Sequence, residues 1–230
     1  MKRFYKTVTI AEEDGGFVVK LDDHRLKTPE KKPLIIPTRA MAEVVKEEWD
    51  SQEDSIDPAR MPMTKLLNTM LDRVEARRDE IIEDLVRFGG NDQLCYRANS
   101  PEDLVHRQET VWTPLLNWVK DHYDIHLKVT SGVLHMAQEP DELLKIRKIL
   151  EGMDSYELTA LHNITTLTGS LTIGLGLHAG KIDMEEAWKA GQLDETYQAE
   201  KWGKDEEAEQ RRRQIKAELG DAVRFLSLMR

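Results

Sequence analysis

The sequence predicts an α+β fold, with a small antiparallel β-rich N-terminal domain (residues 1–60) followed by a larger, mainly helical C-terminal domain (residues 61–230). Three observations support this prediction. Turn signals interrupt the first third of the chain at short intervals, as in a small antiparallel sheet. The spacing of apolar residues changes to a helical period at Thr38. Beyond residue 61, apolar stripes at helical spacing follow one another, several of them preceded by capping residues.

The β-rich part begins with large or β-branched residues that recur in Phe4–Ile10. Gly15-Gly16 is a turn signal, and Phe17–Leu21 follows it as the second predicted strand. The next reversal leads to a short extended stretch, Arg25–Thr28. Leu34–Ile36 is a fourth strand candidate, bounded on both sides by prolines.

The first helix is predicted to begin after Thr38, a suitable N-cap residue. Met41, Val45 and Trp49 recur at helical spacing behind it. The segment Ser51–Pro62 is polar and contains prolines, so it is the best candidate for the boundary between the two domains.

The C-terminal domain is predicted to be a series of helices. Ser100 is expected to cap one of them, with Pro101 at the first helical position and Pro114 as a kink or as the true start. Asp154 is expected to cap a single long helix, and Asp183 a shorter one. The predicted helical stretches cover residues 66–74, 81–88, 102–119, 140–150, 155–178, 184–189 and most of the remainder, with a short strand at 125–129.

Composition excludes several classes of protein. The 230 residues carry a formal net charge of −10, which argues against a general nucleic-acid binder. Cys95 is the single cysteine, so no internal disulfide can form and a reducing compartment is favoured. The chain has no apolar run near the roughly 20 residues needed to span a bilayer and no targeting segment at its start. We therefore expect a cytoplasmic protein without membrane insertion.

The sequence contains no complete catalytic or metal-binding motif. Gly180-Lys181 lacks the other residues of a phosphate-binding loop and is better explained as a helix C-terminus. Ser170 is not in a nucleophile motif, and Cys95 lies between apolar residues, where cysteines are usually inert. His122 and His126 have i, i+4 spacing but no further ligand pattern. We expect no catalytic residue, no metal and no cofactor.

Two features leave alternatives open. The small residues between Gly169 and Gly176 indicate either close helix packing, which we favour, or a groove for a partner segment. Among the tryptophans, Trp112 and Trp118 fit a core. Trp49 and Trp202 stand among polar residues and fit a core or an interface equally well.

Several motifs occur in order over nearly the whole chain. They are Arg3-Phe4-Tyr5-Lys6, Leu21 to Pro29, Glu48-Trp49-Asp50-Ser51-Gln52, Met61 to Leu66 with Asn68, Cys95-Tyr96-Arg97, Arg107-Gln108, Trp112-Thr113-Pro114-Leu115, Asp194-Glu195, Tyr197-Gln198 and Lys201-Trp202-Gly203. In this combination the sequence resembles the ATP-twelve family, which are assembly chaperones for the catalytic head of the F-type ATP synthase.

The resemblance implies a function in addition to a fold. Members of the family bind the unassembled alpha subunit of the ATP synthase until it meets the beta subunit, are not enzymes and need no nucleotide. The resemblance implies a bacterial, cytoplasmic member, and we expect a monomer because nothing in the sequence demands a dimer. The expected partner-binding residues come from two of the motifs: Trp49, Asp50, Gln52, Glu195, Gln198, Trp202 and Gly203.

The acidity of the chain lies in the two stretches that contain these motifs. Residues 183–209 hold ten acidic and three basic residues, and residues 43–57 hold seven and one. Acidic rims beside aromatic anchors would tune the encounter with a partner. The alternative function is a small-molecule enzyme with a carboxylate-lined pocket between the two domains.

Overall fold

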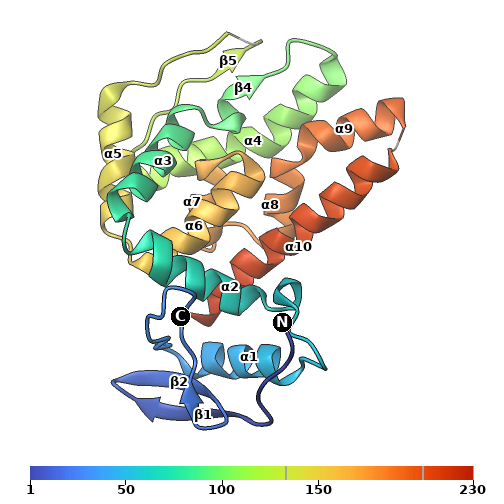
Figure 1. The fold of residues 1–230 in the computed structure, drawn as a ribbon. Helices are drawn as coiled ribbons and strands as arrows, with labels where there is room; N and C mark the ends of the chain where they lie inside the picture. The colour runs from blue at the N-terminus through green and yellow to red at the C-terminus, as the bar shows by residue number, and fades with distance from the viewer. Residues whose placement is uncertain (133, 204, 230) are drawn as a thin grey trace. The chain divides into compact units, whose positions relative to one another are not determined.

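The computed structural model describes residues 1–132, 134–203 and 205–229. A small antiparallel sheet is followed along the chain by many helices (Figure 1), which confirms the predicted α+β class. Contacts divide the chain into two compact units, one of residues 1–78 with 221–230 and the other of residues 79–220. Residues 61–78 thus belong to the same unit as the sheet, and the predicted domain boundary after residue 60 stays a prediction.

The sheet contains β1 (Val8–Glu13), β2 (Gly16–Leu21) and β3 (His24–Arg25), in that order. Its first turn is Asp14-Gly15 rather than Gly15-Gly16. Both turn residues have positive φ, at 54° and 78°, as a two-residue type I′ hairpin requires. The predicted fourth strand is reduced to a single bridge between Phe17 and Ile36. The flanking prolines lack the N–H donors that would extend the pairing.

The helix α1 (Arg39–Asp50) packs on this sheet (Figure 1). The Thr38 hydroxyl accepts a hydrogen bond from the Met41 N–H at 3.2 Å, which confirms the predicted N-cap. Met41, Val45 and Trp49 form the buried face of the helix. The unit is completed by η1 (Pro58–Arg60), α2 (Pro62–Thr69), the π-helical turn η2 (Met70–Val74) and the last residues of the chain.

The second unit is mainly helical. Its elements are α3 (Arg78–Gly90), η3 (Gln93–Cys95), α4 (Glu102–Tyr123), α5 (Pro140–Glu151), α6 (Ser155–Thr168), α7 (Leu171–His178), α8 (Met184–Gly191), α9 (Leu193–Trp202) and α10 (Glu206–Leu228), whose last turns belong to the first unit. A parallel pair, β4 (Tyr96–Arg97) and β5 (Thr130–Ser131), replaces the strand expected at 125–129.

The single helix predicted over residues 155–178 is in fact two helices, α6 and α7. Gly169 ends α6 with a φ of 68°, and a Cβ at this position would come within 2.6 Å of the Gln93 side chain. Ser170 then caps α7 by accepting a hydrogen bond from the Ile173 N–H. The predicted cap at Asp154 is confirmed as a capping box, as is the one at Asp183.

The start of α4 lies one residue later than predicted. Pro101, not Ser100, occupies the N-cap position, and its carbonyl oxygen accepts a hydrogen bond from the Leu104 N–H at 3.0 Å. Glu102 is the first helical residue, and the helix continues through Pro114 to its C-terminus.

Candidate partner-binding site

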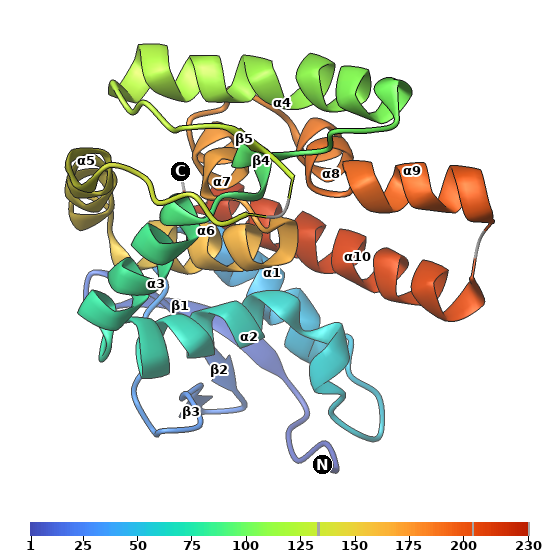
Figure 2. The same cartoon turned by 90° about the horizontal axis from the view of Figure 1, so that it is seen from above.

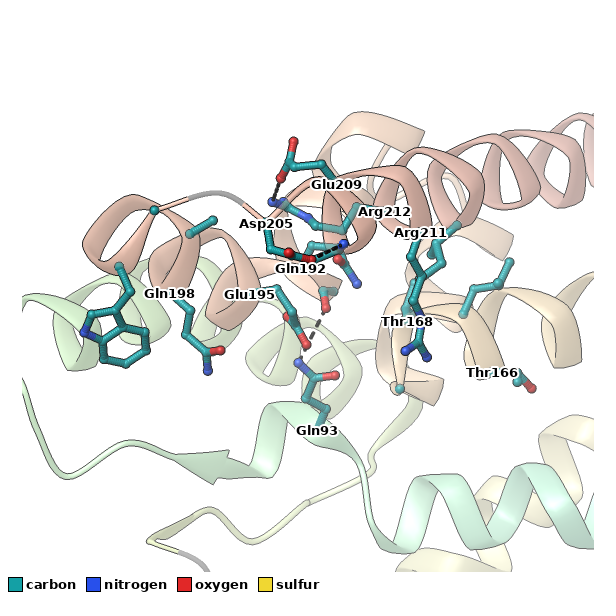
Figure 3. Close-up of a pocket in the computed structure, with 18 residues that line it drawn as sticks. Gln93, Thr166, Thr168, Gln192, Glu195, Gln198, Asp205, Glu209, Arg211 and Arg212 are labelled. Carbon is teal, nitrogen blue, oxygen red and sulfur yellow. Dashed lines mark hydrogen bonds and ion pairs between the residues drawn. The ribbon is translucent and has the colours of Figure 1, made fainter.

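A groove with a volume of about 700 Å³ lies in the second unit, between α9, the first half of α10 and the end of α6 (Figure 3). Glu195, Gln198, Trp202 and Gly203 all line this α9 groove. The i, i+3, i+4 spacing of the first three places them on one face of α9, as predicted. In both Figure 1 and Figure 2, α9 lies beside the first half of α10, which forms the other wall.

Local sequence explains where α9 begins and ends. Asp194 and Glu195 occupy its first turn, where carboxylates interact favourably with the positive end of the helix dipole. Gly203 ends the helix with a φ of 93°, and its N–H donates to the Ala199 carbonyl oxygen at 3.1 Å. Most residues would be strained at this φ, so glycine is well suited to this position.

Polar contacts fasten α9 to α4. The Tyr197 hydroxyl donates to Asp103 at 2.6 Å, and the Lys201 ammonium lies 2.8 Å from the same carboxylate. Further contacts join Gln108 to Asp194 and Arg107 to Glu200, at 2.8 and 2.7 Å. These links hold α9 by the side chains that do not line the groove, which leaves the groove face of α9 free for a ligand.

The Asp103 carboxylate is the most strongly perturbed group in this attachment. Hydrogen bonds from Lys201 and then from Tyr197 lower its pKa to about 2, from an ordinary value of 3.8. The same pair raises the pKa of Lys201. Both groups are therefore charged over the whole physiological range, and the attachment of α9 does not change with pH near neutrality.

The groove itself mixes apolar and charged groups. Trp202 is 78% exposed, an unusual state for such a large aromatic side chain. Glu195 is exposed and forms no ion pair with any residue in the described part of the chain. Arg212 is held by Glu209 at 3.1 Å (Figure 3). Its guanidinium also donates a hydrogen bond of 2.7 Å to the Thr196 hydroxyl. An exposed aromatic ring with polar groups around it is the usual composition of a protein-binding hot spot.

Comparisons with known proteins give the family. The family model described as ATP12 chaperone protein matches residues 2–120. The crystal structure of Atp12 from Paracoccus denitrificans is 41% identical, with a TM-score of 0.95 over 100% of this chain and 98% of that chain. The chain belongs to the ATP12 chaperone family.

Two further relatives agree with membership of the ATP12 family. A putative chaperone from Agrobacterium tumefaciens is 39% identical, with a TM-score of 0.93 over 100% of this chain and 86% of that one. The mitochondrial protein atp12 of Schizosaccharomyces pombe is 23% identical over 90% of this chain and 75% of its own length. The predicted family resemblance is thus confirmed, and with it the class of a chaperone for ATP synthase assembly.

The structure places the other three predicted residues in the first unit, where two of them are buried. Trp49 is 9% exposed, so of the two ambiguous tryptophans Trp49 lies in the core and Trp202 on the surface. Gln52 is 2% exposed. Its side-chain amide donates a hydrogen bond to the Glu48 carbonyl oxygen and accepts one from the Asp57 N–H. Asp50 is exposed, at 3.8 Å from Arg3.

Sequence reasoning missed two buried carboxylates. Glu48 accepts hydrogen bonds from the Met63 and Thr64 N–H groups, at 2.7 and 2.8 Å. Asp92 accepts from the Leu94 and Thr172 N–H groups, at 3.0 and 2.8 Å. Burial raises the pKa of both. Each caps a helix distant in sequence, α2 for Glu48 and α7 for Asp92, and no local signal marks these distant contacts. Asp92 is also the local N-cap of η3.

The remaining candidates for chemistry have structural explanations. Cys95 is buried, and burial raises its pKa well above that of a free thiol, which makes a thiolate nucleophile unfavourable. Among the described residues, no group of three or more His, Cys, Asp and Glu side chains could hold a metal ion. No helix in the described ranges is long and apolar enough to cross a bilayer.

Proposed function

We propose that this chain is a cytoplasmic, monomeric chaperone that binds the unassembled alpha subunit of the ATP synthase through the α9 groove. Membership of the ATP12 family supports the class of function. The observation that carries the proposal is Trp202, 78% exposed at the mouth of a groove that Glu195 and Gln198 also line. The proposal includes no catalytic step and no cofactor.

The physical role follows from the state of an unassembled subunit. Such a subunit exposes apolar surface that its partner will later cover, and that surface invites wrong association. A chaperone must cover it reversibly, so dissociation has to be fast enough for transfer to the beta subunit. One exposed aromatic anchor surrounded by charged residues is compatible with this moderate affinity. The acidic stretch of residues 183–209 would mainly set the encounter rate and the choice of partner.

The test is capture of the alpha subunit in cells that lack the beta subunit. We expect the chain to co-purify with alpha and to reduce its aggregation. Glu195→Lys should reduce the captured amount by about tenfold, because it reverses a charge in the groove. Asp121→Lys makes the same charge change on an exposed position of α4 outside the groove, and should capture alpha normally. Absence of any complex with the unaltered chain would overturn the proposal.

A further inference from the structure

A second groove lies in the first unit and differs in character from the α9 groove. It has a volume of about 630 Å³ and a mainly apolar lining. Its walls include Trp49 at the end of α1, Met61 before α2, and Asn68 within α2. Lys65 and Arg73 also line it and carry the exposed charges considered below. We call it the Trp49 groove.

Two polar atoms of this groove lack hydrogen-bond partners. The Trp49 Nε1–H is a donor and the Asn68 Oδ1 is an acceptor. Both are shielded from solvent, and neither bonds to any residue in the described part of the chain. More than nine in ten buried polar groups in proteins are hydrogen-bonded, so an unpaired donor and an unpaired acceptor on one groove are an uncommon combination. The backbone of one extended residue, with one C=O and one N–H on the same edge, has the complementary pair.

The charges at the groove favour an anionic ligand. Lys65 and Arg73 are exposed and form no ion pair with a described residue. The acidic residues of the groove, Glu30 and Asp72, both face Lys32, whose Nζ lies 3.8 and 3.9 Å from their carboxylates. Asp72 is also bound by the Thr28 hydroxyl at 2.7 Å. Lys32 thus offsets only part of the charge of the two acids, whereas no described carboxylate pairs with Lys65 or Arg73, and a carboxylate is the complementary group for these two cations.

We propose that the Trp49 groove binds an extended acidic peptide segment of another protein. The C=O and N–H of one extended residue of the segment bond to Trp49 Nε1–H and Asn68 Oδ1, an apolar side chain packs on the wall formed by Met61, and a neighbouring carboxylate pairs with Lys65 and Arg73. Because the two polar atoms are shielded in the free protein, binding requires small shifts of lining side chains. This site is independent of the α9 groove, and its ligand class is not part of the proposed function.

The test uses the full chain and a synthetic peptide, acetyl-Ser-Leu-Glu-Leu-Ser-amide. The readout is the NMR signal of the Trp49 indole N–H, assigned by its loss in Trp49→Phe. Peptide should move this signal downfield in a saturable manner, as a new hydrogen bond does. Replacement of the peptide Glu by Lys, or N-methylation of the peptide bonds, should weaken binding about tenfold or more.

Two further variants of the chain provide a second measurement, which does not require the Trp49→Phe variant to fold. Asn68→Ala should weaken binding about tenfold, and Lys65→Glu by a similar factor. Lys27→Glu makes the same charge change at an exposed position of the same unit outside the groove, and should bind normally. The proposal fails if the Trp49 signal stays fixed at millimolar peptide, or if the lysine peptide binds equally well. It also fails if dilution of the protein alone moves the signal, which would identify a second copy as the occupant.

Discussion

The carboxylate of Asp103, in the first turn of α4, accepts a hydrogen bond of 2.6 Å from the hydroxyl of Tyr197 on α9. The same carboxylate lies 2.8 Å from Lys201, one turn further along α9. Two of the four contacts described above between α4 and α9 therefore end on one side chain, which is not itself part of the α9 groove. Partner binding should depend on this residue through position alone.

Asp103→Asn is expected to loosen α9. Asparagine keeps an acceptor for Tyr197 but loses the charge that attracts Lys201. Hydrogen exchange of the α9 amides should become several-fold faster while that of α6 stays unchanged, and capture of the alpha subunit should fall. Asp121→Asn, on an exposed position of α4, is the matched control and should alter neither measurement.

Acid should release the same attachment. The Asp103 pKa is lowered in the folded state, to about 2 from 3.8. A group of this kind stabilises the fold fully above its unfolded-state pKa, and the contribution is lost as pH falls through the folded-state value. The difference in α9 amide exchange between the unaltered chain and Asp103→Asn, measured relative to α6, should thus be constant above pH 3.8 and shrink as the pH falls towards 2. Loosening near neutral pH would contradict this assignment.

Glu48 is expected to be essential for the stability of the first unit. Glu48→Ala leaves the Met63 and Thr64 N–H groups and the Thr64 hydroxyl without their buried acceptor. The free energy of unfolding should fall by roughly 2–4 kcal/mol, measured by urea denaturation. Glu43→Ala, at a less buried position of the same helix, should cost less than about 0.5 kcal/mol. Equal losses for the two variants would mean that Glu48 does not cap α2.

Three of the caps between neighbours in sequence were predicted, whereas the one expected at Ser100 was wrong and the one at Ser170 was missed, and no cap across the chain was predicted. The caps at Thr38, Asp154 and Asp183 were predicted because each bonds to an N–H three residues away. Glu48 and Asp92 also accept hydrogen bonds from helix N-termini, but these N–H groups lie 15 and 80 residues away, and no sequence spacing predicts such contacts.

The candidate site shows the same division. The helical spacing of Glu195, Gln198 and Trp202 was enough to place them on one face. The burial of Trp49 and the exposure of Trp202 were not predictable, because both residues have polar neighbours in sequence and differ only in their tertiary packing. Likewise, the break at Gly169 depends on the position of Gln93, which lies far away in the sequence.

The helix pair α6 and α7 should be sensitive to small increases in volume. A Cβ at Gly174 would lie 2.7 Å from Leu161 Cδ1 and 2.9 Å from Thr165 Oγ1, and both residues are buried. Gly174→Ala gains about 1 kcal/mol of helix propensity but overpacks the interface by about 1–3 kcal/mol. We expect net destabilisation in thermal unfolding. A higher melting temperature would show that the interface can relax.

Substitution of Trp112 should reduce the stability of the chain, whereas substitution of Trp202 should reduce partner binding. Trp112 is 0% exposed and donates from Nε1 to the Ala190 carbonyl oxygen at 2.8 Å, whereas Trp202 is 78% exposed at the α9 groove. Trp112→Ala should therefore lower the free energy of unfolding by about 3–5 kcal/mol, through a cavity and an unpaired carbonyl. Trp202→Ala should change it by less than about 0.5 kcal/mol and yet weaken capture of the alpha subunit by about tenfold or more. If Trp202→Ala captured alpha as well as the unaltered chain, Trp202 would not be the anchor, and the exposed ring would need another explanation.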